Sequence, residues 1–137
     1  MILLAGGTKD SRIIAEELLK YNHKITVTTA TEYGGQLISN LDLEVKVAKL
    51  DLVGLENLAK EINVSQIIDA THPYAIEISK NLLKLSTIMD VPYYRYERSM
   101  LEYKKENSFY NLEELISFLE GVKGNILLLN GRRLYDK

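Results

Sequence analysis

The sequence predicts an α/β fold with a Rossmann-like, doubly wound parallel sheet, and three observations carry this prediction. Short apolar runs bounded by turn residues recur along the 137 residues. Segments with helical spacing lie between most of these runs, which is the pattern of βαβ units. Several runs are nearly continuous in Ile, Leu, Val and Thr, as in strands that helices cover on both faces. The expected strands are Ile2–Ala5, Ile25–Thr29, Glu44–Ala48, Gln66–Ala70 and Pro92–Glu97.

Four helices are expected from apolar residues that recur at intervals of three and four positions. The first is expected to be capped by Asp10 or Ser11. The fourth is bounded by Asn111 and Gly121, and Glu114 completes a capping box with Asn111. The expected helices are Ser11–Tyr21, Leu52–Ile62, Ala75–Met89 and 111–121.

Composition narrows the classes of function. The net charge of −2 comes from 17 basic and 19 acidic residues, so no basic surface favours nucleic acid or an anionic membrane. No apolar stretch approaches the roughly 20 residues that span a bilayer. The absence of cysteine excludes disulfides and thiolate ligands and is typical of a reducing compartment. We expect a cytoplasmic protein without a metal site, since the only two histidines, His23 and His72, are far apart in sequence.

The end of the chain repeats the pattern of its beginning. Asn125–Gly131, like Met1–Gly7, is an apolar run that leads into a glycine turn, and only a short segment follows. Because a parallel strand needs cover on both faces, we expect residues 1–124 to form an N-terminal dinucleotide-binding domain. Residues 125–137 then begin a second, similar domain that is truncated. A final edge strand with a short tail is the alternative.

Ligands of an open parallel sheet bind outside the carboxyl ends of its strands. The segment after the first strand has the spacing of the dinucleotide fingerprint, with Thr8 and Ser11 in place of the later glycines. Two glycines let the backbone approach an anion at the start of a helix. We therefore predict a phosphate site formed by Gly6, Gly7, Thr8, Lys9 and Ser11. A tight turn that uses glycine for its geometry alone is the alternative.

The end of the second strand lacks the acidic residue that binds the ribose in NAD-specific folds. Small side chains at Thr28, Thr29 and Ala30, with Gly34 and Gly35 beyond them, leave space for a 2′-phosphate. NADPH is therefore favoured over NADH as cofactor. Threonine is also common in strands for packing reasons, and the acidic Glu32 is close in sequence.

The segment after the fourth strand reads Thr71-His72-Pro73-Tyr74. A histidine at the ligand-binding edge can line a nicotinamide or substrate pocket, or it can simply shape the turn. We take His72 and Tyr74 as candidate catalytic residues and Thr71 as a candidate cofactor contact. His23 lies in a polar turn and is expected to be solvated.

Four arginines lie at or after strand ends. A guanidinium can clasp a carboxylate in a fork, so such residues suit a substrate with several carboxylates. Ordinary surface charge is the alternative for each of them. The candidate substrate contacts are Arg95, Arg98, Arg132 and Arg133.

Three motifs, in this order and spacing, resemble the N-terminal half of precorrin-6A reductases, and the resemblance covers about the whole chain. They are Ile2–Thr8 followed by Ser11-Arg12, Asp69–Ala75, and Tyr94–Arg98. The sequence departs from the family's usual pattern at Ser99, Asn130 and Arg132.

The resemblance implies two Rossmann-like domains, with NADPH and a tetrapyrrole macrocycle in the cleft between them. The implied reaction is hydride transfer that reduces one double bond of precorrin-6A, or of its cobalt complex, to the 6B product. The glycine turn would hold the cofactor phosphates, Thr28–Ala30 the ribose, and Thr71–Tyr74 would face the cleft. A nucleotide-binding or interaction module without turnover is the alternative, and the oligomeric state is left open.

Overall fold

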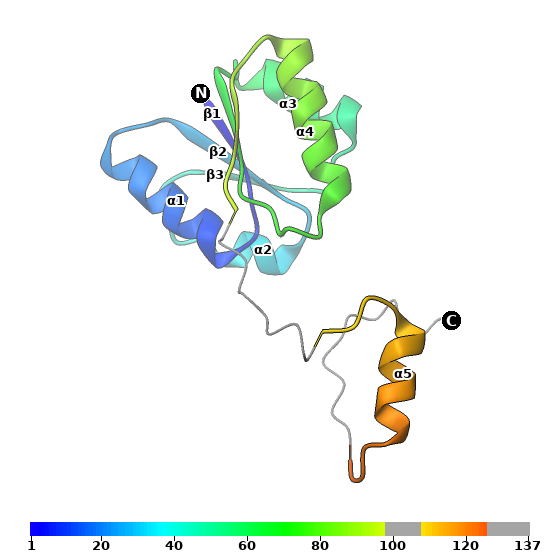
Figure 1. The fold of residues 1–137 in the computed structure, drawn as a ribbon. Coiled ribbons are helices and arrows are strands. Elements are labelled where there is room, and N and C mark those ends of the chain that lie inside the picture. Colours follow the sequence, from blue (N-terminus) through cyan, green and yellow to red (C-terminus); the bar gives the residue numbers. More distant parts are fainter. Residues whose placement is uncertain (98–107, 126–137) are drawn as a thin grey trace. The chain divides into compact units, whose positions relative to one another are not determined.

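The computed structural model describes residues 1–97 and 108–125, which fall into two compact units, Met1–Ser99 and Met100–Lys137. The first unit holds a five-stranded parallel sheet in the order β3-β2-β1-β4-β5 (Figure 1). The Rossmann-like sheet predicted from the sequence is confirmed. The strands are β1 (Ile2–Ala5), β2 (Ile25–Thr29), β3 (Glu44–Val47), β4 (Gln66–Asp69) and β5 (Tyr93–Arg95). The helices of this unit are α1 (Lys9–Lys20), α2 (Glu32–Gln36), α3 (Leu52–Glu61) and α4 (Ile76–Met89).

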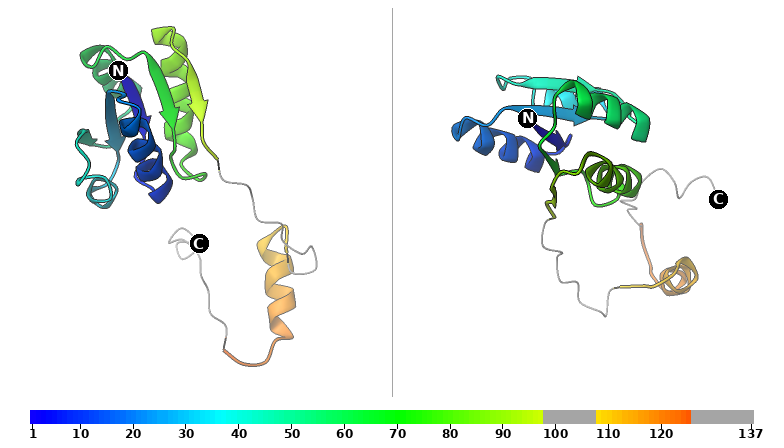
Figure 2. Two further views of the ribbon diagram at one scale, coloured as in Figure 1. Left: turned by 90° about the vertical axis from the view of Figure 1, so that its left-hand side faces the viewer. Right: turned by 90° about the horizontal axis from the view of Figure 1, so that it is seen from above.

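The strand order reverses at β1, which lies between β2 and β4. The register pairs Ala5, at the end of β1, with Thr28 in β2 and with Asp69 at the end of β4. All strands run in the same direction, as the arrows in Figure 2 show. The loops after β1, β2 and β4 therefore leave the sheet at one edge, at the switch point where such sheets bind ligands.

Helices cover both faces of the sheet, as a doubly wound fold requires. Leu3 of β1 packs with buried residues of α3 and α4, such as Leu55 and Leu82. The next residue, Leu4, points to the other face and packs with Ala15 of α1. In Figure 1, α1 and the pair α3 and α4 accordingly lie on opposite sides of the strands. This two-sided cover explains why β1 and β2 are buried at every position.

The short helix α2 is the main element that the sequence pattern does not predict. Its five residues include Gly34 and Gly35, which lower helix propensity, and they are too few to show a helical period. The ends of the other elements lie within about two residues of the predicted ones, the usual uncertainty of helix ends.

The predicted cap of the first helix is wrong. Thr8, rather than Asp10 or Ser11, is the N-cap, and α1 begins at Lys9. The Thr8 hydroxyl accepts the N–H of Ser11 at 3.1 Å, while the Ser11 hydroxyl accepts the N–H of Thr8 at 3.1 Å. This is a reciprocal capping box in which serine takes the place usually held by Glu or Gln.

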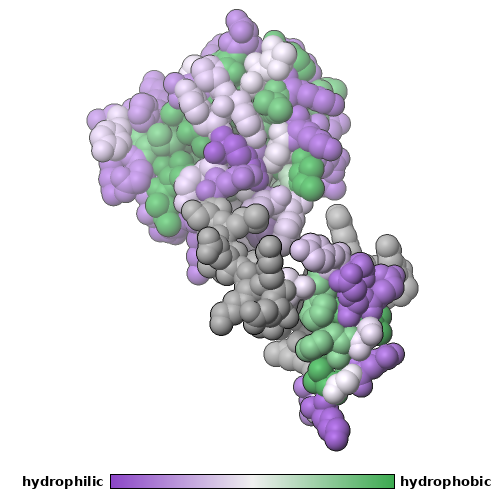
Figure 3. All heavy atoms as spheres, viewed as in Figure 1, coloured by the Kyte–Doolittle hydropathy of each residue, from purple (hydrophilic) through white to green (hydrophobic). Residues whose placement is uncertain are grey.

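The second unit contains α5 (Leu112–Glu120), which is capped as predicted. The Asn111 side chain accepts the N–H of Glu114 at 2.8 Å, and the helix ends at Gly121. The Glu114 carboxylate accepts hydrogen bonds from the Asn111 amide and from the N–H of Tyr110. No residue of α5 is buried, and apolar side chains gather along the helix in Figure 3.

The division between the units falls at Ser99, ahead of the predicted boundary at residue 124, so α5 groups with the second unit. The predicted strand Asn125–Gly131 lies, after its first residue, outside the described residues. That residues 125–137 begin a second Rossmann-like domain stays a prediction. Within the part of the chain that the structure describes, no helix is long and apolar enough to cross a membrane.

Candidate functional site at the carboxyl edge of the sheet

The turn after β1 is built around the side chain of Ser11, which is fully buried. Its hydroxyl accepts the N–H groups of Gly7 and Thr8 at 3.0 and 3.1 Å and donates to the Thr8 carbonyl at 2.7 Å. A Cβ on Gly6 would lie 2.4 Å from the Ser11 Cβ, so this arrangement requires glycine at position 6. Gly7 has a φ of +110°, which glycine adopts far more readily than other residues.

The short helix α2 packs directly on this turn. A Cβ on Gly34 would lie 2.9 Å from the Cα of Gly7 and 2.6 Å from the Thr29 hydroxyl. A Cβ on Gly35 would lie 2.6 Å from the Val47 side chain. The space expected beside these two glycines is therefore filled by protein atoms. A direct contact of Gly34 and Gly35 with a cofactor stays a prediction.

The outer side of the turn can accept an anion. Gly6, Gly7 and Thr8 are half-buried, and they precede the 12-residue helix α1, whose positive dipole end favours negative charge. The N–H groups of Gly7 and Thr8 already bond to Ser11, whereas that of Lys9 makes no hydrogen bond among the described residues. An anion would meet the Lys9 N–H first. To bind the N–H groups of Gly7 and Thr8 as well, it would have to displace the Ser11 hydroxyl from them.

At the end of β2, the structure separates the predicted ribose contacts by exposure. Thr28 and Thr29 are buried, and the Thr29 hydroxyl donates to the Thr31 carbonyl at 2.8 Å. Ala30 is exposed, as are Thr31, which caps α2, and Glu32 in the first turn of that helix. Ala30 is therefore the predicted ribose contact that is open to a ligand.

The turn after β4 lies beside the glycine turn, because the Thr8 hydroxyl donates to the Ala70 carbonyl at 3.2 Å. His72 and Tyr74 are exposed, and Tyr74 has 87% of its surface accessible. Their ring centroids are 5.1 Å apart, and the N–H of Tyr74 donates to His72 Nδ1 at 3.3 Å. The structure thus brings the predicted phosphate site and the two predicted catalytic residues to one edge of the sheet.

A polar cluster around Asp69, which the sequence patterns do not predict, supports this edge from within and includes two predicted site residues, Thr71 and Arg95. Asp69 is fully buried, and its carboxylate pairs with Arg95 Nη1 at 2.6 Å. The same carboxylate accepts the Thr71 hydroxyl at 2.6 Å, the Thr71 N–H at 3.0 Å and the Tyr93 hydroxyl at 2.9 Å. Arg95 also donates to the hydroxyls of Thr71 at 3.0 Å and Ser79 at 2.7 Å. A signal was present, because Asp69 directly follows the apolar Ile67 and Ile68, and a carboxylate that is buried must find partners.

The electrostatics of this cluster favour a charged Asp69 and a neutral Tyr93. Burial acts to raise the pKa of the Asp69 carboxyl, but hydrogen bonds led by that of the Thr71 side chain hold it below its ordinary value. Burial, reinforced by the hydrogen bond to the Asp69 carboxylate, raises the pKa of Tyr93 to about 12. The cluster therefore holds one negative and one positive charge, on Asp69 and Arg95.

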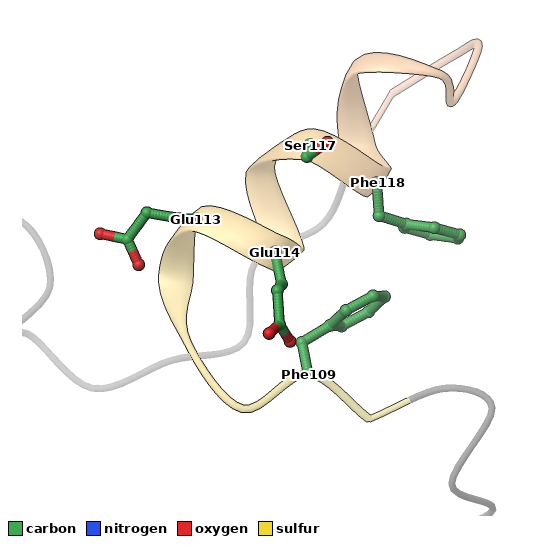
Figure 4. Close-up of a pocket in the computed structure, with 5 residues that line it drawn as sticks. All are labelled: Phe109, Glu113, Glu114, Ser117 and Phe118. Carbon is green, nitrogen blue, oxygen red and sulfur yellow. The ribbon is translucent and has the colours of Figure 1, made fainter.

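The other predicted substrate contacts, Arg98, Arg132 and Arg133, lie outside the described residues. Among the residues that are described, no group of His, Asp and Glu side chains could hold a metal ion. The second unit has a shallow hollow over α5, where the rings of Phe109 and Phe118 lie 5.0 Å apart with Glu114 beside them (Figure 4). It gathers no constellation typical of catalysis.

Fold and site together define a class of protein: a Rossmann-like parallel α/β domain whose polar loops meet at the switch point of the sheet. All of residues 1–137 match the family described as "Precorrin-6x reductase CbiJ/CobK". The chain belongs to this family, which confirms the resemblance found in its motifs.

Relatives support the same assignment. The chain is 31% identical over 135 residues to the cobalt-precorrin-6A reductase of Priestia megaterium, with 97% of this chain and 53% of the relative covered. It is 35% identical over 136 residues to that of Methanococcus maripaludis, with 95% and 54% covered. A solved structure titled "CobK precorrin-6A reductase" matches 85% of this chain and 46% of its own, with a TM-score of 0.67 and 20% identity, a likeness of fold. The chain thus spans about half the length of these proteins.

Proposed function

We propose that the protein takes part in the NADPH-dependent reduction of a ring double bond in precorrin-6A, or in its cobalt complex, to the 6B product of cobalamin biosynthesis. The observation that carries the proposal is the hydrogen bond from the Thr8 hydroxyl to the Ala70 carbonyl, because it joins the glycine turn to the loop that bears His72. A cofactor bound at the glycine turn would extend towards the loop that bears His72. The names of the relatives supply the reaction class, and the lack of cysteine favours the cytoplasm as its location.

The residues present fit a dinucleotide. The glycine turn is half exposed at the start of α1, and the Lys9 side chain beside it is exposed and basic. We assign the cofactor phosphates to Gly6, Gly7, Thr8, Lys9 and Ser11, and the ribose to the end of β2 at Ala30. The bound cofactor would supply the hydride, and the protein would supply position and electrostatics.

Saturation of a double bond needs a proton as well as a hydride, and the loop after β4 offers two donors. His72 Nδ1 accepts the N–H of Tyr74, so a neutral His72 ring carries its proton on Nε2. The exposed Tyr74 hydroxyl is the second candidate donor. We propose that His72 and Tyr74 line the substrate pocket, where their adjacent rings can also pack on a flat macrocycle.

The preference for NADPH rests on the small side chains at the end of β2, and Glu32 is the side chain there that opposes it. A carboxylate in the first turn of α2 would repel a 2′-phosphate. Glu32→Gln should therefore raise the affinity for NADPH and leave that for NADH unchanged, as measured by titration of nucleotide fluorescence. Tighter binding of NADH than of NADPH by the unaltered protein would overturn the assignment of the cofactor.

The phosphate site is tested by Gly7→Val. A branched side chain at a φ of +110° should displace the turn and weaken nucleotide binding by about tenfold or more. His23→Ala is the control, because His23 is exposed in the turn between α1 and β2, away from the ligand edge. Circular dichroism would verify that both variants fold. Unchanged binding by a folded Gly7→Val protein would remove the cofactor site.

Turnover is best measured on the longest natural form of the protein, because this chain spans about half the length of its relatives. We expect oxidation of NADPH that depends on added precorrin-6A or cobalt-precorrin-6A. A rate no higher than background would favour the alternative class, a nucleotide-binding or interaction module without turnover.

A further inference from the structure

The loop that carries the two candidate catalytic residues has few anchors of its own. His72, Pro73 and Tyr74 are all exposed. Their hydrogen bonds among the described residues stay within the loop and its border: Tyr74 N–H to His72 Nδ1 at 3.3 Å, and Ala75 N–H to the His72 carbonyl at 2.8 Å. The position of this loop must therefore be set by the segments that precede and follow it.

One side chain, Arg95, joins those two segments. Its Nη1 donates to the hydroxyl of Thr71, which precedes the loop, at 3.0 Å, and to the hydroxyl of Ser79, in α4 after the loop, at 2.7 Å. The two hydroxyl oxygens are 3.4 Å apart, and Ser79 also contacts the Ala75 carbonyl at the start of α4. Arg95 thus closes the base of the loop from the neighbouring strand β5.

Asp69 keeps Arg95 in place. The carboxylate is fully buried 2.6 Å from Nη1, and it also binds the hydroxyl and the N–H of Thr71. A guanidinium paired with a buried carboxylate gives up this geometry at a large cost, because the carboxylate would be left uncompensated. The Arg95 side chain is only 19% exposed, and its outward bond runs from Nε to Glu97 at 3.0 Å.

We infer that Arg95 is a positioning residue, which clamps Thr71 and Ser79 together and so fixes His72 and Tyr74 at the ligand edge, with Asp69 as its buried counter-charge. The sequence alone assigns Arg95 to the carboxylates of a substrate, and the inference gives it a different task. The claim that the clamp serves catalysis rests on the proposed function of the loop. The hydrogen bonds that form the clamp do not depend on that proposal.

The test is Arg95→Lys, which keeps the positive charge beside Asp69 but replaces the planar fork by a single ammonium group. Loss of the clamp should raise the amide hydrogen-exchange rates of Tyr74 and Ala75 by about tenfold, the effect of losing one hydrogen bond to a charged group. Rates in β1 and β2 should stay unchanged. Glu97→Gln is the matched control, because it removes the charge of the exposed partner of Arg95 and leaves the inner contacts intact.

Exchange rates that do not change in the loop, or that rise equally in β1 and β2, would overturn the inference. If Arg95→Lys fails to fold, Ser79→Ala removes one of the two clamped hydroxyls and should still accelerate exchange at Ala75.

In the full-length enzyme, the clamp predicts a fall in kcat with little change in KM for the macrocycle. A rise in KM alone, with normal exchange, would instead make Arg95 a substrate contact. Exchange needs no nucleotide, so failure of the proposed cofactor site would leave this readout intact.

Discussion

Asp69 is a fully buried charge, and such a charge persists only where it is paired and hydrogen-bonded. It directly follows the apolar residues Ile67 and Ile68 in the sequence, but its partners Tyr93 and Arg95 are more than 20 residues away. The pairing depends on the register of β4 with β5, which places Asp69 opposite Arg95. Local sequence patterns predict the strands but not this register, and so they do not predict the cluster.

Asp69 should make the stability of the protein depend on acid pH. Its folded-state pKa lies below the ordinary value, so its contribution is present above about pH 4 and is lost as the pH falls through the lowered pKa. Asp69→Asn should lower the free energy of unfolding at neutral pH by about 3 kcal/mol, because Arg95 loses its counter-charge. Urea unfolding at neutral and acid pH measures both effects.

The variant should also show a weaker loss of stability on acidification than the unaltered protein. The exposed Asp90→Asn is the control, and it should change stability little at either pH. An acid dependence that is identical in Asp69→Asn and the unaltered protein would contradict this assignment of the buried charge.

Tyr93 gives an optical signature of the same cluster. Of the nine tyrosines, Tyr93 should ionise with a pKa of about 12. A raised folded-state pKa means that its contribution to stability is complete below about pH 10 and is lost as the pH rises through 12. Titration of phenolate absorbance should show a late step that disappears in Tyr93→Phe. The step should remain in Tyr94→Phe, where the exposed neighbour is changed.

At the scale of elements, prediction succeeds where burial imposes a pattern. β1 and β2 are covered on both faces and are recognisable as continuous apolar runs, and α5 is bounded by its cap residues. The helix α2 lacks such a pattern, and its Gly34 lies close to Gly7, which is distant in sequence.

Gly34→Ala should therefore destabilise the fold although it raises helix propensity. The new Cβ would lie 2.9 Å from the Gly7 backbone and 2.6 Å from the Thr29 hydroxyl, so α2 must move away from the turn. We expect a loss of about 1–3 kcal/mol, the usual cost of overpacking, measured by denaturant unfolding. At Gly121, where the nearest atom to a Cβ is the Phe118 carbonyl at 3.6 Å, alanine should be nearly neutral. Equal stabilities of the two variants would mean that α2 does not press on the turn.

At the scale of the whole molecule, the first unit contains its own core. Both clusters of buried apolar residues lie within Met1–Ser99, one on each face of the sheet. The Asp69 cluster, the glycine turn and the loop after β4 also lie there. Sequence patterns predict the strands and helices of this unit well, because its two cores impose burial patterns on them.

The segment Met1–Ser99, produced alone, should fold cooperatively and bind the nucleotide that we propose as cofactor as well as the whole chain does. Because both cores are complete within it, we expect its free energy of unfolding to lie within about 1 kcal/mol of that of the sheet in the whole chain.

The matched comparison is Met1–Asp90, which ends after α4 and lacks Tyr93 and Arg95. This shorter segment exposes β4 and leaves the buried Asp69 without its counter-charge, at a cost of about 3–5 kcal/mol, so it should be largely unfolded. Circular dichroism and denaturant titration would separate the two segments. If Met1–Ser99 were unfolded while the whole chain folded, the second unit would have to supply stability that the two cores do not.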